Sequence, residues 1–588
     1  MSTSKNRKKM KRLRYIPLYI ILLVSASSCS DYLEKAPGVD VTEDTIFSSK
    51  LQLETFVAGT YYWGLLSDLP MWDARDKRDC FSGAATDECE AANTWYWAQG
   101  WNTASLTASD NRDSRWTTHW KAIRRTNTII ALIDNAPFDD PNYKKQVRGE
   151  AKFLRAYNYW QLFIKYGGVP ILRHRFDLDD NFYVPRGTID DVVKFMVQDC
   201  DDAYTDLPSA SEYPSNLRGR ASKAAALALK SRILLYAASP TFNTATPYMD
   251  FGGNNTLICY GNKDDKRWEA AAEASRLAIQ EAINSGFSLI KDKGVDKNYQ
   301  YVWETPDNSE IILAEKSKEA MGPWHFPWGP RIPNTGASGF GPGSSLTYNF
   351  LKKYETKNGT QQTWDDNGGN DLMAKLKELD PRFAQSVAYQ GQKWDNNDLL
   401  VLDFTSKDPN DPNDKDGRNN CIGGALVHKP VPYSVSSKQS VVPNGIILRL
   451  GELYLNYAEA LNECHSTPPT EAYDAVDEIR ARSGMPPFPR NLSQAEFRER
   501  IRNERSIELA FEGHRLWDIR RWEIAEQEGV MQGNMYGIKI YKIAGVSDEY
   551  TYKPYVFEVR SFKTRMYRHP FPQSEMDKLY LIQNPGYE

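Results

Sequence analysis

Large aromatic side chains stand in two polar stretches of the sequence that are rich in Gly, Pro and Asn. The first stretch reads NTWYWAQGWNT, and the second, PWHFPWGPR, lies in the second half of the chain. Sugars present C–H faces that stack on flat rings, while nearby polar side chains bond their hydroxyl groups. The candidate carbohydrate-binding residues in these stretches are Trp95, Trp97, Trp101, Trp324 and Trp328, and Tyr301 just upstream of the second stretch is added to them. The alternative for each single ring is that it packs its own loop onto the core.

No catalytic or cofactor-binding motif accompanies these aromatic residues. The His residues are scattered without metal-ligand spacing, and HExxH, GxSxG and GxxxxGK[ST] are all missing. Acidic residues are abundant enough for a glycosidase pair, but spacing alone nominates no pair. The sequence therefore predicts a binding protein that is not an enzyme and needs no metal or cofactor. A surface glycoside hydrolase is the less favoured alternative.

The segment 495–522 is predicted to be a strongly charged helix. Its charged residues fall at pairing distance along one helix: Glu504, Glu508, Glu512, Arg500, Arg505 and Arg515. A catalytic role for these groups is possible in principle. A set of ion pairs that holds one helix in register against its neighbours is the favoured interpretation.

Amphipathic helices are predicted over much of the chain from the apolar spacing i, i+3, i+4, i+7. The clearest stripe contains Leu450, Leu453, Tyr454, Tyr457 and Leu461. Further helices are expected within 47–67, 115–137, 144–172, 188–208, 220–240 and 267–286. The helix within 144–172 is expected to end at Gly167, Gly168 and Pro170. Helix, short turn and helix is the unit of a helical-hairpin repeat. The sequence therefore predicts a mainly α fold of three or four irregular helical hairpins.

Two long segments interrupt this helical pattern. Residues 68–114 form a long polar loop, and the region from about 291 to 445 is dense in Gly and Pro with a few short β-like runs. Loops of this length on a rigid scaffold often carry the binding residues. The expected organisation is a signal peptide (1–28), a tether (29–46), a helical region with the long binding loop 68–114 (47–290), a loop-rich inserted ligand-binding subdomain (291–445) and a C-terminal helical region with a tail (446–588).

The N-terminus has the pattern of an export signal. Basic residues crowd positions 5–14, an apolar run follows over 16–24, and the small residues SASS precede Cys29. The run is too short to span a bilayer. Cys29 after small residues resembles a bacterial lipobox, although Ala26 stands where Leu is usual. We expect Cys29 to be acylated, with an ordinary cleavage site as the alternative.

Charge and cysteine content narrow the possible partners. The whole chain carries a formal charge of −4 and its first 28 residues carry +7, which leaves −11 for the exported chain. A net acidic protein lacks the basic footprint that nucleic-acid binding needs. No CxxC pair occurs, so a zinc site is not expected. Cys80 and Cys89 could close a small disulfide loop, but their spacing does not decide this.

Several longer segments resemble one known family. They are SCSDYLEKAP, FLRAYNYWQLFIKYGGVPIL, LRLGELYLNYAEALNE, YDAVDEIRARSGMP, RNERSIELAFEGHRLWDIRRW and FPQSEMDKLYLIQNPGY, with the shorter TDE at 86–88. Together they resemble the SusD/RagB-like outer-membrane lipoproteins of glycan-utilisation systems. The resemblance spans nearly the whole exported chain in the expected order.

This resemblance implies about four tetratricopeptide-like helical hairpins that carry a loop-rich ligand-binding part. It implies a lipid anchor on the outer membrane of a Gram-negative bacterium, at its outer face, and a lid-like partnership with a TonB-dependent SusC-like β-barrel transporter. Members of the family bind an oligosaccharide on an arc of aromatic rings without cleaving it. The arc would combine the loop after TDE, with Trp95, Trp97 and Trp101, and the inserted subdomain, with Tyr301, Trp324 and Trp328. Some relatives take up peptides or other nutrients, so a peptide-binding protein is a further alternative.

Overall fold

The computed structural model describes residues 42–69, 75–91, 95–177, 179–214, 217–316, 343–394, 397, 401–406, 421–429, 431–434 and 441–588. Cys29, Trp324 and Trp328 lie outside these residues. The chain forms two compact units, the first comprising Met1–Phe56 with Asn135–Asp139, and the second comprising Val57–Asp134 with Asp140–Glu588. The described part of the first unit contains α3 (Glu43–Phe47) and the beginning of α4 (Lys50–Gly64).

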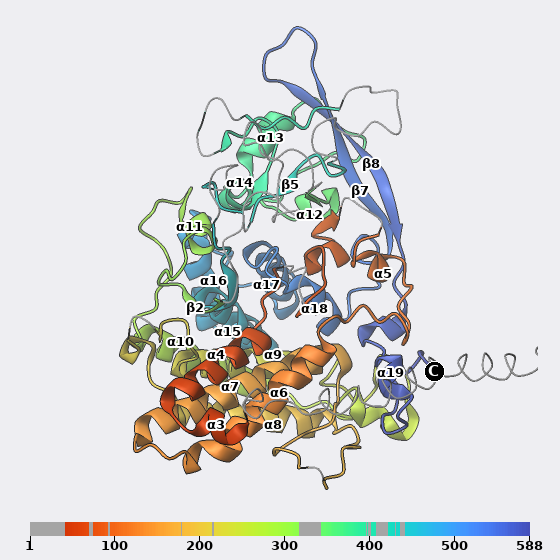
Figure 1. Cartoon of the computed structure of the whole chain (residues 1–588). Helices are drawn as coiled ribbons and strands as arrows, with labels where there is room; N and C mark the ends of the chain where they lie inside the picture. The colour runs from red at the N-terminus through yellow and green to blue at the C-terminus, as the bar shows by residue number, and fades with distance from the viewer. Residues whose placement is uncertain are drawn as a thin grey trace, which may run out of the picture. The chain divides into compact units, whose positions relative to one another are not determined.

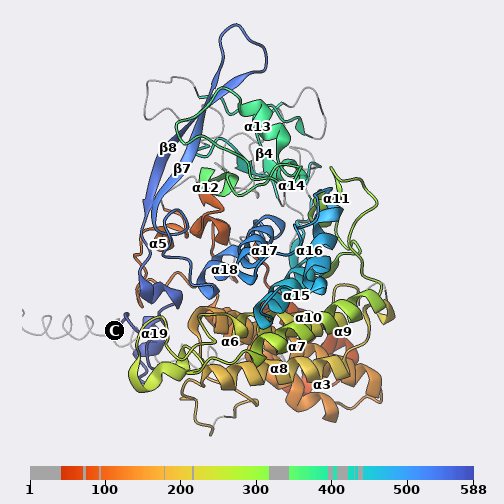
Figure 2. The ribbon, with the colours of Figure 1, turned by 180° about the vertical axis from the view of Figure 1, so that it is seen from behind.

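The long helices of the second unit form one continuous stack. They are α6 (Trp116–Leu132), α7 (Pro141–Tyr166), α8 (Ile189–Asp206), α9 (Lys223–Ala238), α10 (Lys266–Asn284) and α15 (Leu450–Cys464). Each packs against the next, so α15 continues the stack on α10 after more than a hundred intervening residues (Figures 1 and 2). α16 (Thr470–Arg482) and α17 (Gln494–Glu508) then pack on α15. The predicted mainly α fold of helical hairpins is confirmed.

Local signals in the sequence explain where these helices begin and end. Thr188 caps α8 through a capping box in which its Oγ1 accepts from the Asp191 N–H at 3.1 Å. α7 ends at residue 166, directly before the glycines predicted to end it, and Gly167 adopts a φ of 77°. A Cβ at the next residue, Gly168, would lie 2.1 Å from the carbonyl oxygen of Gly187, so this turn requires glycine. Among the described residues, no helix is long and apolar enough to cross a bilayer.

A short antiparallel strand pair opens and closes the loop-rich insertion. β2 (Ile311–Glu315) leads into it and β6 (Gly445–Arg449) returns to the helices, with Ala314 opposite Ile446. Both were predicted as β-like runs. A second sheet has the order β1 (Cys89–Ala91), β3 (Ser344–Leu346), β5 (Leu426–Val427) and β4 (Val387–Ala388). Because β1 belongs to the 68–114 loop, this sheet joins that loop to the insertion.

Short helices fill the remaining loop-rich parts. They are α5 (Gln99–Asn102), α11 (Asn298–Glu304), α12 (Tyr348–Leu351), α13 (Leu372–Glu378), α14 (Pro381–Ser386) and α19 (Gln573–Met576). Two hydrophobic cores result. One lies among the stacked helices, around Trp160 and Leu229. The other lies beneath the loop-rich part, around Trp101, Trp394 and Ile519.

Two features differ from the sequence predictions. The C-terminal region contains a long hairpin of β7 (Gly533–Lys542) and β8 (Tyr550–Arg560), which the helical periodicity did not indicate and which projects at the top of Figure 1. The predicted helix over 495–522 is wrong as one element. It divides into α17 and α18 (Arg515–Arg521), because Phe511 and Gly513 adopt φ values of 61° and 82°.

Candidate functional site

Trp97 is half-buried and held in one orientation by the 68–114 loop. Its indole N–H donates to the carbonyl oxygen of Arg112 at 2.5 Å, and its backbone N–H donates to Asp79 Oδ1 at 2.9 Å. The guanidinium carbon of Arg78 lies 5.7 Å from the ring centroid. Two donated hydrogen bonds and a cation over the ring leave Trp97 little freedom to rotate.

The Arg78 side chain is itself locked by buried carboxylates. It pairs with Asp68 at 2.7 Å and with Asp76 at 2.9 Å, while Arg115 donates to the same Asp76 oxygen at 2.5 Å. Burial opposes ionisation of Asp76, but Arg115 and Arg78 together hold the pKa of this carboxyl far below its usual value. Trp97 therefore stands next to a buried cluster of hydrogen-bonded ion pairs.

The three tryptophans predicted in this loop have different environments. Trp95 is 71% exposed, and it is the one exposed Trp among the described residues. Its ring meets Tyr96 edge-on, with centroids 5.9 Å apart. Trp101 is 0% exposed and packs against Trp97 and His569 at 5.7 and 4.2 Å. Because both faces of Trp101 lie in the core, the prediction that it stacks on a sugar is wrong, and we assign it to packing.

The TDE segment anchors this loop to the C-terminal helices. Asp87 is fully buried and receives two hydrogen bonds of 2.7 Å from Arg515 on α18. Glu88 accepts from the backbone N–H of Phe511 at 3.2 Å. Within the described part of the chain, its second oxygen is buried without a hydrogen-bond partner, and burial raises the pKa of Glu88 to about 8. A carboxyl in this state is protonated at neutral pH.

Tyr301 lies away from the tryptophans. It is half-buried on α11, and the Lys293 ammonium lies 4.9 Å from its ring centroid. α11 and α5, which follows Trp95 closely, stand on opposite sides in both views (Figures 1 and 2). The structure therefore does not bring Tyr301 and Trp95 into one arc.

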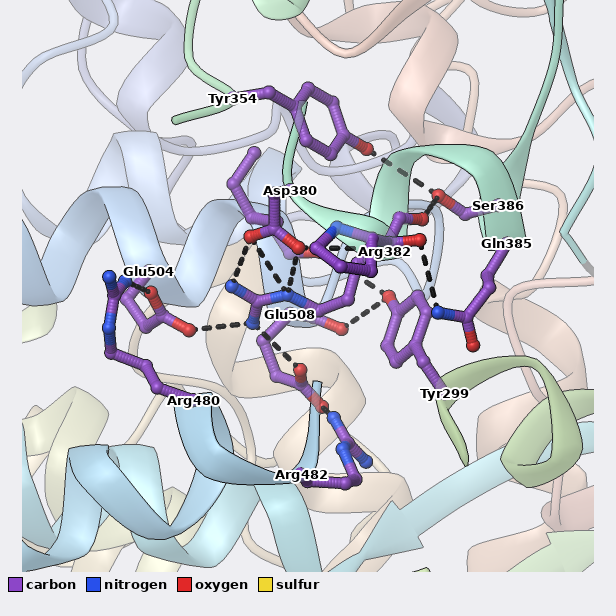
Figure 3. Close-up of polar contacts among 12 residues, drawn as sticks. Tyr299, Tyr354, Asp380, Arg382, Gln385, Ser386, Arg480, Arg482, Glu504 and Glu508 are labelled. Carbon is purple, nitrogen blue, oxygen red and sulfur yellow. Dashed lines mark hydrogen bonds and ion pairs between the residues drawn. The ribbon is translucent and has the colours of Figure 1, made fainter. Parts of the chain in front are cut away.

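A buried ion-pair cluster connects α17 to three other segments (Figure 3). Glu508 is 0% exposed and accepts from Arg449 at 2.7 Å, from Arg382 at 3.0 Å and from Arg482. These arginines come from the end of β6, from α14 and from the end of α16. Burial opposes ionisation of Glu508, but Arg482, Arg449 and Arg382 hold its pKa well below the usual value. One carboxylate thus joins the insertion to the helical stack.

The partners in this cluster differ from those predicted. Glu504 pairs with Arg382 at 2.6 Å and with Arg480 at 2.7 Å, and not with an arginine of its own helix. The arginines expected to pair along the helix bind elsewhere: Arg500 to Glu355, Arg505 to Asp518 and Arg515 to Asp87. The structural role was predicted correctly. The distant partners could not be read from i, i+4 spacing, which reports only on neighbours along one helix.

Comparison with known proteins fits this architecture. A model of the SusD family matches residues 291–587, which is just over half of the chain. The chain belongs to the SusD family. A second SusD-like model, described as starch-binding and associating with the outer membrane, matches residues 31–235. The first of these in chain order ends within α9, and the other begins at residue 291, after α10.

Individual relatives are similar over nearly their whole length. SusD-like protein P25 of Formosa agariphila is 24% identical over 542 residues, covering 87% of this chain and 90% of the relative. A SusD-like protein from Bacteroides fragilis is 25% identical, with a TM-score of 0.75 over 94% of this chain and 100% of its own. Another from the same species, described as a SusD-like carbohydrate-binding protein, is 21% identical with a TM-score of 0.70, over 91% of this chain and 99% of its own.

The structure of this SusD-family chain also decides whether two of its cysteines are paired, which the sequence left undecided. Cys80 and Cys89 are both buried and both free thiols, so the suggested disulfide is absent. Arg78 and Asp79, which contact Trp97, were not predicted as part of the site. The run RDKRDC before TDE was the available signal, but charge alone does not show which groups fix an aromatic ring.

Proposed function

We propose that this SusD-family protein is a non-catalytic, cell-surface glycan-binding lipoprotein. It captures oligosaccharide or polysaccharide and passes it to a TonB-dependent SusC-like transporter in the outer membrane. Family membership supports this proposal, as does the carbohydrate-binding description of a protein with the same fold. The observation that carries it is the exposed Trp95 beside the fixed Trp97.

An indole exposed to this extent is costly unless it has a partner. Trp95 leaves most of a large apolar ring in water, where a core position would bury it. The contacts of Trp97 with Arg78, Asp79 and Arg112 keep the neighbouring backbone in place before any ligand arrives. A pre-organised ring loses little conformational freedom on binding, which favours stacking on a sugar face.

Replacing Trp95 by Ala is expected to weaken binding of the retained polysaccharide. Loss of one stacking ring costs about 0.5–1.5 kcal/mol beyond area burial, which corresponds to an affinity about two- to twelvefold lower. Affinity electrophoresis of the purified protein through gels containing soluble starch, β-glucan or mannan measures this directly.

Phe182→Ala provides the matched control for this experiment. Phe182 is also an exposed aromatic residue, but it lies on another loop. We expect its removal to leave retention unchanged. If Trp95→Ala migrates like the parent protein in every gel that retains the parent, the site is misplaced.

The two alternatives predict different results in simple assays. A surface glycoside hydrolase would release reducing sugar from the same polysaccharides, and one Asp or Glu substitution would abolish the release. A peptide-binding protein would bind a peptide mixture and pass through every polysaccharide gel. Retention without product release supports the proposed function against both.

We further propose that Cys29 carries the lipid anchor. Several acyl chains on one residue would hold the protein firmly on a membrane, because each buried methylene adds about 0.8 kcal/mol. Cys29→Ala is expected to move the protein from the outer-membrane fraction to the soluble fraction of cells that lack the transporter. Detection of the protein in both fractions by antibody measures the change. Undiminished membrane retention of the variant would contradict the anchor.

A further inference from the structure

A pocket of about 650 Å³ lies between α11 and the segment that follows α14. This volume is within the range typical of small-ligand sites. α11 and α14 neighbour each other, and both views place them on the side of the second unit away from α5 (Figures 1 and 2). The pocket is therefore separate from the Trp95 site.

Three tyrosines form the aromatic part of this pocket: Tyr301, Tyr389 and Tyr433. Each is partly exposed, and two of them pack on buried aromatic rings. Tyr389 packs on Phe383 with centroids 5.2 Å apart, and Tyr433 packs on Trp394 at 4.7 Å. Rings that are half in contact with protein and half open to a pocket are suited to stacking on a ligand.

Hydrogen bonds hold the polar part of the lining in place. Glu304 accepts from the Gln300 side chain at 2.5 Å and from the Tyr433 backbone N–H at 2.9 Å. Gln385 accepts from the Gln300 backbone N–H at 3.0 Å, and its amide donates to the carbonyl oxygen of Pro381 at 3.0 Å. Gln385 appears in Figure 3 beside the buried ion-pair cluster. The lining is therefore tied to the rigid part of the fold.

The charges around the pocket do not favour an ion of either sign. Lys293, Lys297 and Lys393 line it together with Asp296 and Glu304. A phosphate or sulfate site would concentrate cations, and a cation site would concentrate carboxylates. Mixed donors and acceptors around tyrosine rings match a neutral ligand that has both hydroxyl groups and C–H faces.

We propose that the pocket formed by Tyr301, Tyr389 and Tyr433 is a second glycan-binding site that takes a short segment of a neutral glycan. The class of ligand rests on the proposed function, whereas the position rests on the pocket itself. Two separate sites on one protein hold a long polysaccharide more tightly than either site alone, because the second contact is intramolecular. Short oligosaccharides gain nothing from this effect.

Tyr301→Ala tests the second site in the full-length protein. With the polysaccharide that the parent retains best, we expect an affinity about two- to twelvefold lower for Tyr301→Ala, and a further loss when it is combined with Trp95→Ala. Tyr301→Phe keeps the ring and is expected to bind like the parent. Isothermal titration with a short oligosaccharide of the same glycan should give two sites for the parent, one of which is about two- to twelvefold weaker in Tyr301→Ala.

The outcomes separate this inference from the proposed function. Should the parent bind polysaccharide while Tyr301→Ala keeps the parent's affinity for the polysaccharide and for the oligosaccharide at both sites, the second site is disproved and the glycan-binding function stands. A parent that binds no glycan disproves both. Should Tyr301→Ala not fold, Lys297→Trp at the exposed rim obstructs the pocket and is expected to give the same loss; unchanged binding by that variant would overturn the inference.

Discussion

Glu508→Gln is expected to lower the free energy of unfolding by about 3–5 kcal/mol. The substitution preserves the shape of the side chain but removes a buried negative charge that faces Arg382, Arg449 and Arg482. None of these guanidinium groups can move to water without displacing α14, β6 or α16. The loss therefore reflects buried cations left without sufficient counter-charge, more than the loss of a single hydrogen bond.

Urea denaturation of the parent and the variant at neutral pH measures this effect. Glu499→Gln is the matched control, because it makes the same chemical change on the same helix at a side chain that is 78% exposed. Replacing an exposed charge of this kind changes the free energy of unfolding by no more than about 0.5 kcal/mol. Equal stability of Glu508→Gln and Glu499→Gln would show that the buried cluster does not hold the insertion on the helices.

The regular helices were predictable because their signals are local. Thr188, Asp140 and Gly167 mark helix ends by capping chemistry that acts within one turn. The strands β2 and β6 were also visible as short apolar runs. The β7–β8 hairpin was missed although its sequence, with YGIKIY and YTYKPYVFEV, is rich in β-branched and aromatic residues. Its period-2 pattern was obscured by apolar residues on both faces, which also fit other structures.

The candidate site was less predictable, because exposure is a tertiary property. Trp95 and Trp101 stand in the same polar stretch with similar neighbours, yet one is exposed and the other lies in the core against His569. Likewise, Asp87 meets Arg515 across more than four hundred residues of sequence. Spacing along the chain carries no information on such contacts, and the family resemblance pointed to the loop without ranking its rings.

Ionisation of Glu88 is expected to make the free energy of unfolding depend on pH in the opposite sense to ionisation of Glu508. Glu88→Gln is expected to remove the contribution of Glu88. Burial raises the pKa of Glu88 from 4.5 to about 8, so the folded protein keeps a proton that the unfolded chain releases above pH 4.5. The stability contributed by the protonated carboxyl is complete below pH 4.5 and is lost as the pH rises through about 8. Over that interval the loss approaches about 4 kcal/mol. Glu508, whose pKa is lowered, instead contributes stability that is lost as the pH falls, so the two effects occupy separate pH ranges.

Gln at position 88 stays neutral at every pH, so the variant should lack this loss. The stability difference between Glu88→Gln and the parent should therefore grow by up to about 1.4 kcal/mol per pH unit between pH 4.5 and about 8, in favour of the variant. Urea midpoints at a series of pH values measure this difference, and other titrating groups cancel because both proteins share them. Glu499→Gln serves again as the control and should follow the parent at each pH. Parallel pH profiles of Glu88→Gln and the parent would mean that Glu88 is ionised in the folded protein, and that its buried oxygen finds a compensating partner.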